Sequence, residues 1–172
     1  DDVEEVSKKE RNLIKLIPFD EEEYKRNLNI KYVYGEKGYT TIERTGIRPT
    51  LDVCGIWGGY MGEGSKTVLP SKAYAKLSAR LVPNQKYEKI AKLVEKHLLK
   101  TAPKHIDIKV TRLHGAESYV CPIDSAEYKA AEKAYEKVFG IKPLPVRRGG
   151  SIGVVPVFEK VLGVKPILMG FG

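Results

Sequence analysis

The sequence is poor in cysteine, and its two thiols, Cys54 and Cys121, lie far apart in the chain. Two cysteines form neither a disulfide framework nor a metal-binding knuckle. No stretch approaches the roughly 18 apolar residues that a membrane span needs. The acidic, polar start DDVEEVSKKE is unlike a signal peptide. These absences predict a cytoplasmic, reducing environment without a membrane partner.

Complete sets of catalytic or metal-binding residues are also lacking. The three histidines, His97, His105 and His114, fall in different expected elements, and none forms an H-x-x-x-H pair. Ser151 stands in R-G-G-S-I, which differs from the G-x-S-x-G turn of hydrolase nucleophiles. Paired carboxylates occur only in lysine-rich helical stretches. The sequence therefore predicts no catalytic residue and no metal ligand in this chain.

Positive charge dominates, with a formal net charge of +8, but it is unevenly placed. Residues 1–23 carry nine acidic and four basic side chains, a net charge of −5, which leaves +13 for the remainder. Many lysines stand among glutamates on the polar faces of expected helices, as on a solvated surface. No aromatic and basic platform accompanies them. We therefore expect no nucleic-acid partner.

Both ends of the chain are unusual for a complete protein. There is no initiator methionine, and the last residues, KPILMGFG, read as a buried strand. Chain termini are usually polar and frayed. We interpret the chain as an internal piece of a longer protein.

Hydrophobic periodicity predicts a mixture of helices and strands. Asp124 with Glu127 approximates a capping box, Gly140 and Gly163 fit helix ends, and Ser151 can cap the last helix. Helices are expected at residues 6–17, 20–28, 86–100, 123–140 and 152–163, and strands at 51–57, 68–83, 106–115, 143–151 and 166–171. In the second strand, alternation predicts one buried and one polar face, with Arg80 on the polar face. The order indicates an antiparallel sheet with a helix on it, then a parallel α/β unit, with a boundary near residues 115–122.

The stretch GEGSKTVLP contains glycines followed by Lys-Thr, as phosphate-binding loops do. In such a loop the lysine directly follows the last glycine and a helix begins there. Here Ser65 separates Gly64 from Lys66, and the chain after Thr67 alternates like a strand. A nucleotide site is therefore disfavoured.

A second glycine-rich stretch is a better candidate for ligand binding. Gly149, Gly150 and Ser151 open an expected helix, whose free N–H groups attract anions. Arg147 and Arg148 precede them, and Arg80 could add a guanidinium fork for a carboxylate or phosphate. A plain capped helix with surface arginines is the alternative, and it is the commoner arrangement.

Several long motifs resemble one known family. These are RPTLDVCGIWGGYMGEGSKTVLPSKAYAKLSARLVPNQ, LHGAESY, KVFG, RRGGSIGVVPVFEKVLG and PILMGFG, with GYTTIERT before them. Together they resemble the carnosinase and aminoacylase family of zinc peptidases, and its bacterial dipeptidase branch in particular. The resemblance implies an α/β (α+β) fold with an incomplete, ferredoxin-like lid. It divides the chain into a lid insertion (1–49), the lid or dimerisation domain (50–118) and a βαβ-like part of the catalytic domain (119–172).

The resemblance also implies a function. Full-length members hydrolyse dipeptides or short amides with two zinc ions, whose ligands are expected outside this chain, and they form homodimers through the lid. It assigns substrate contacts to Thr67, which reaches a neighbouring subunit's substrate, and to Arg80, His114, Gly150 and Ser151. The segment alone is expected to be inactive. The alternative is a dimerisation or binding module without catalysis of its own.

Two stretches depart from the family's pattern. The family usually reads R-E-G-G-S-I-P, where this chain has Arg148 and Gly153, and H-G-G-x-P, where it has HGAES. An arginine in place of an acid would strengthen the attraction for a carboxylate. These departures leave the identity of the substrate open.

Overall fold

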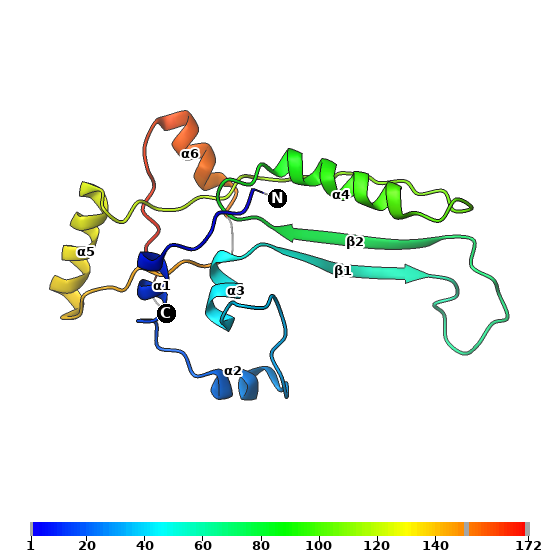
Figure 1. Ribbon diagram of the computed structural model, residues 1–172, viewed down its shortest axis with the longest axis horizontal. Coiled ribbons are helices and arrows are strands. Elements are labelled where there is room, and N and C mark those ends of the chain that lie inside the picture. Colours follow the sequence, from blue (N-terminus) through cyan, green and yellow to red (C-terminus); the bar gives the residue numbers. More distant parts are fainter. Residues whose placement is uncertain (1, 150–151, 171–172) are drawn as a thin grey trace.

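The computed structural model describes residues 2–149 and 152–170. The described residues form helices α1 (Lys8–Ile14), α2 (Glu21–Leu28), α3 (Thr41–Ile47), α4 (Tyr87–Thr101), α5 (Ala126–Phe139) and α6 (Val154–Leu162), and strands β1 (Thr50–Gly58) and β2 (Ala73–Arg80). In Figure 1 a long β-hairpin extends to one side of the molecule, helix α4 extends in the same direction, and the other helices lie on the side of the hairpin's base.

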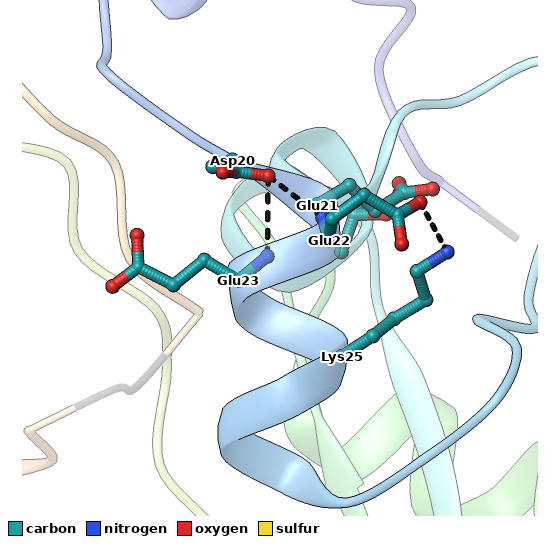
Figure 2. A network of polar contacts seen from close by, with 6 residues as sticks. Asp20, Glu21, Glu22, Glu23 and Lys25 are labelled. Atoms are coloured by element: carbon teal, nitrogen blue, oxygen red, sulfur yellow. Dashed lines mark hydrogen bonds and ion pairs between the residues drawn. The ribbon is translucent and has the colours of Figure 1, made fainter.

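Side-chain caps define where the first three helices begin. Ser7 accepts a hydrogen bond from the Glu10 amide at the start of α1. At α2 the Asp20 carboxylate accepts from the Glu22 and Glu23 amides, as Figure 2 shows. These two bonds lower the pKa of the Asp20 carboxyl, that from Glu23 most. Such caps satisfy amides that have no partner within the helix.

Helix α3 was not among the sequence expectations. Its signature is a capping box, in which the Glu43 amide donates to Thr40 Oγ1 and the Thr40 amide donates to the Glu43 carboxylate. The S/T-x-x-E spacing that encodes this box was present in the sequence. The stretch is only seven residues long and contains Gly46, so helical periodicity was too short to reveal it.

Strands β1 and β2 form an antiparallel pair, as predicted. Thr50 pairs with Arg80 at one end and Gly58 with Ala73 at the other, with one irregularity between Val53 and Gly55. The expected burial of one face is wrong for this chain, because every residue of β2 is exposed. The sheet has only these two strands among the described residues, so no further layer covers its apolar side chains.

Helix α4 confirms the predicted amphipathic helix to within one residue. It is followed by an extended segment that returns along it, held by an ion pair between Arg112 and Glu95. Residues 106–115, expected as a strand, have no strand partner among the described residues. The same holds for the described parts of 143–151 and 166–171. A strand needs a neighbour for its ladder of hydrogen bonds, and periodicity alone cannot supply one.

The ends of α5 and α6 follow the glycine signals. Gly140 and Gly163 both adopt the left-handed conformation, with φ of 68° and 66°, which ends each helix as predicted. The start of α5 corrects the expectation of an Asp124 capping box. The N-cap is Ser125, whose hydroxyl accepts from the Tyr128 amide at 3.1 Å.

The buried apolar core is small. It comprises Ile14, Ile47, Val82 and Val155, which come from α1, α3, the segment after β2, and α6. Many larger apolar side chains are exposed in this chain, and Leu69 at the hairpin loop is 95% exposed. The core therefore lies near the base of the hairpin, and the hairpin projects from it (Figure 1).

Candidate substrate-binding site

Arg80 is the last residue of β2 and pairs with Thr50 at the start of β1, which places it at the base of the hairpin. Its side chain is exposed, and no carboxylate of the described residues forms an ion pair with it. Directly after it the chain turns, and the Val82 amide donates to Gln85 Oε1 at 3.0 Å. The backbone of Arg80 is thus fixed by its strand pairing with Thr50, and its exposed guanidinium can donate hydrogen bonds to a ligand.

Thr67 lies at the other end of the hairpin, in the loop between β1 and β2. The loop surrounds a hollow of about 520 Å³. Trp57 and Tyr74 stack across the hairpin beside it, with ring centroids 5.2 Å apart and planes within 9°. Thr67 itself is exposed between Lys66 and Val68, which line the hollow.

The hairpin separates these two candidate residues. Strands rise roughly 3.3 Å per residue, so the eight residues of β2 span about 23 Å. Thr67 precedes Ala73, the first residue of β2, by six residues and so lies in the loop past the far end of that strand. The structure therefore does not bring Thr67 and Arg80 of one chain to the same small ligand.

His114 is exposed on the extended segment that follows α4. The next residue, Gly115, lies against the ring of Tyr87, and a Cβ there would come within 2.3 Å of Tyr87 Cδ2. The neighbouring charge of Glu88 is the main cause that raises the pKa of the Tyr87 hydroxyl. This packing fixes the backbone beside His114.

Gly150 and Ser151 lie outside the described residues. The residues on either side are described. The Gly149 amide donates to the Thr45 carbonyl at 3.0 Å, and Gly153 stands at the N-cap of α6. The helix therefore begins two residues after residue 152, where the sequence predicts its start, and its N-cap is Gly153 in place of the predicted Ser151.

Two of the departures from the family pattern meet in space. A Cβ on Gly153 would lie 2.9 Å from the methyl carbon of Ala116. Ala116 stands where the pattern H-G-G-x-P has glycine, and Gly153 stands where R-E-G-G-S-I-P has proline. The alanine methyl therefore occupies space that a larger residue at position 153 would need. The contact also brings the His114 segment to the start of α6.

The two arginines before Gly149 have different environments. Arg147 forms an ion pair with Glu10 of α1, which was not foreseen from the sequence. Arg148 is exposed and has no ion pair among the described residues. Arg147 is therefore already neutralised, and Arg148 and Arg80 are the better candidates for an anionic ligand.

The described residues do not fit a metal cofactor. Within 2–149 and 152–170, no three His, Cys, Asp or Glu side chains are grouped so that they could hold an ion. Burial raises the pKa of the Cys121 thiol, which keeps it protonated at neutral pH. No described helix is long and apolar enough to cross a membrane. What this surface offers chemically is donors for an anion.

Known proteins share both sequence and structure with this chain. Residues 8–106 match the peptidase dimerisation domain. The chain is 35% identical to the Cys-Gly metallodipeptidase dug1 of Schizosaccharomyces pombe over 127 residues, which cover 72% of this chain and 27% of the relative. It is 30% identical to the Cys-Gly metallodipeptidase DUG1 of Saccharomyces cerevisiae, covering 97% of this chain and 35% of the relative.

Solved structures agree with the sequence matches. The M20 family metallo-carboxypeptidase Sso-CP2 of Sulfolobus solfataricus superposes with a TM-score of 0.80 at 34% identity, covering 95% of this chain and 37% of the other. Human carnosine dipeptidase 1 gives a TM-score of 0.76 at 27% identity, covering 94% and 35%. The chain spans about a third of the length of these proteins. The resemblance inferred from the motifs is thereby confirmed, and the chain belongs to the M20 family of metallopeptidases, whose dimerisation domain residues 8–106 match.

Proposed function

We propose that this chain is the substrate-gripping and dimerising part of a metal-dependent hydrolase that cleaves dipeptides or short amides. The observation that carries the proposal is the agreement of the dimerisation-domain match with relatives that are named metallodipeptidases. Because the described residues hold no metal cluster, the chain's own contribution is binding and orientation. The metal is proposed to be zinc, two ions as the resemblance implies, bound by residues outside this chain.

Arg80 is proposed to grip the terminal carboxylate of the substrate. Its guanidinium is exposed, its backbone lies at the end of β2, and it has no ion pair among the described residues. A guanidinium can hold a carboxylate through two parallel hydrogen bonds. His114, Gly150 and Ser151 are proposed to complete this pocket. Fixing one end of the substrate orients the amide bond for attack and removes part of the entropic barrier.

Thr67 is proposed to act across a homodimer. The length of the hairpin carries Thr67 away from Arg80 of its own chain, which favours a contact with a substrate in the partner. Exposed apolar side chains on the hairpin, such as Leu69 and Ile56, are suited to burial between two copies. We place the protein in the cytoplasm, with no nucleic-acid or membrane partner.

The test is an assay of the full-length protein that contains this chain. Cys-Gly and β-Ala-His are the substrates, because relatives are named for them. We expect hydrolysis that a chelator abolishes and zinc restores, and a dimer by light scattering. The purified 172-residue chain should show no turnover with zinc. A full-length protein that dimerises but cleaves neither these nor other dipeptides would support the non-catalytic alternative.

A further inference from the structure

The helices of the N-terminal third contact the segment Arg147–Gly149 in a way that the proposed function does not use. The amide of Gly149 donates to the carbonyl oxygen of Thr45 at 3.0 Å. Thr45 lies in the last turn of α3, where carbonyls have no partner within the helix. The segment Arg147–Gly149, which precedes the proposed substrate contacts Gly150 and Ser151, therefore caps the C-terminus of α3.

Glycine is required on both sides of this contact. A Cβ on Gly149 would lie 2.4 Å from the Thr45 oxygen, and a Cβ on Gly46 would lie 2.6 Å from the Arg147 oxygen. Neither glycine has a positive φ, so backbone conformation does not explain them. Close approach of the two backbones does.

Two charged side chains of α1 form ion pairs with the residues on either side of the contact between α3 and Arg147–Gly149. Glu10 forms the ion pair with Arg147. The next residue, Arg11, contacts the Glu43 carboxylate at 2.9 Å, and Glu43 is only 3% exposed. Adjacent residues of α1 thus hold the Arg147 segment and the capping box of α3 together. A carboxylate buried this deeply is costly unless paired, so the arrangement is closely specified.

The residues that follow β2 lie beside the same contact between α1, α3 and the segment Arg147–Gly149. Val82 and Pro83, just beyond Arg80, line a small depression together with Ile47, Glu10 and Arg147. Val82 is 6% exposed and Ile47 is 5% exposed. The strand that presents Arg80 and the segment that precedes Gly150 are therefore both anchored on α1 and α3.

We propose that Glu10 and Gly46 are positioning residues, which set the spacing between Arg80 and the segment Arg147–Gly149 and so the fit to a substrate carboxylate. The inference rests on the proposed function and extends it to the N-terminal helices. Neither residue touches the substrate. Each acts through the placement of Arg147–Gly149 relative to the end of β2.

The first test is Gly46→Ala in the full-length enzyme. The added methyl must push the Arg147 carbonyl away, and misplacement of about 1 Å can cost up to about 100-fold. We expect KM for a dipeptide to rise at least about fivefold with kcat within about twofold. A dipeptide with an amidated C-terminus should show no such change in KM. The matched control is Gly55→Ala, where a new Cβ meets nothing closer than 3.6 Å.

The second test covers the case in which Gly46→Ala does not fold. Glu10→Arg and Arg147→Glu should each raise KM for free-carboxylate dipeptides, and the double variant should restore it, because the pair is re-formed with its charges exchanged. A lower melting temperature with unchanged KM in all these variants would overturn the inference and leave a structural contact. If Arg80→Ala raises KM while these variants do not, the inference alone fails. If Arg80→Ala has no effect either, the proposed carboxylate grip fails.

Discussion

The amide of Gly149 donates a hydrogen bond to the carbonyl oxygen of Thr45, across a sequence separation of more than one hundred residues. This contact joins α3 to the segment that precedes Gly150 and Ser151, which we propose to contact the substrate. It is made possible by the absence of a side chain at Gly149, where a Cβ would lie 2.4 Å from the accepting oxygen.

Gly149→Ala is expected to destabilise the protein. The methyl group cannot be placed without moving one of the two backbones, and overpacking of this kind costs about 1–3 kcal/mol. Denaturant unfolding followed by fluorescence would measure the loss. Gly55→Ala is the control, and an equal free energy of unfolding for the two variants would contradict the close approach.

The pair Ala116 and Gly153 should show compensation. Gly153→Ala brings a methyl within 2.9 Å of the Ala116 methyl, so it should lower the melting temperature. Ala116→Gly in the same chain removes the obstacle and should recover most of the loss. The coupling of contacting residues is typically about 0.5–3 kcal/mol in a double-mutant cycle. Strictly additive effects would show that the two positions do not meet.

Arg80→Ala should raise KM for dipeptides by about tenfold or more, with a smaller effect on kcat, because a charged hydrogen-bonding partner of the substrate is lost. In Arg80→Lys the KM should lie between that of Arg80→Ala and that of the unmodified enzyme, since an ammonium group lacks the planar fork of a guanidinium. Arg26→Ala, an exposed arginine on α2, is the control. Unchanged kinetics for Arg80→Ala on a free-carboxylate substrate would refute the grip.

Mixed dimers test the separation of Thr67 and Arg80. If each site combines Arg80 of one protomer with Thr67 of the other, a heterodimer of Thr67→Ala and Arg80→Ala protomers keeps one intact site. Its activity should be about half that of the unmodified dimer, as two-fold symmetry requires. Each homodimer should be much less active. A heterodimer no better than the mean of the homodimers would place both residues in the same protomer's site.

Glu36 provides a pH-dependent contribution to stability. The hydrogen bond from Arg48 is the main cause that lowers the pKa of the Glu36 carboxyl from 4.5, and the two side chains form a paired contact at 2.7 Å. A depressed pKa stabilises the fold above the unfolded pKa, and this contribution is lost as the pH falls through the folded value. Glu36→Gln should therefore lower the melting temperature at pH 7, and the difference should be smaller at pH 3, which lies below the ordinary carboxyl pKa of 4.5.

The control for that comparison is Glu63→Gln. Glu63 is exposed in the hairpin loop and has no ion pair among the described residues. Its replacement should leave the melting temperature nearly unchanged at both pH values. A Glu36→Gln effect of the same size at pH 7 and pH 3 would show that charge is not its origin.

Local signals in the sequence were sufficient for several elements. The stripe of α4, the left-handed glycines after α5 and α6, and the alternation of β2 each depend on neighbours within a few residues, so their pattern is written into the chain. The long motifs in addition identified the family and its dimerisation domain. The domain boundaries near residues 49 and 118 stay predictions.

Contacts between segments that are distant in the sequence were decided only by the tertiary structure. The pairing of Glu10 with Arg147, the approach of Gly46 to the Arg147 carbonyl, and the meeting of Ala116 with Gly153 join residues that no periodicity relates. The lack of strand partners for residues 106–115 among the residues that the structure describes is of the same kind. Helix and turn signals are short-range, whereas the position of a backbone against another depends on how the whole chain packs.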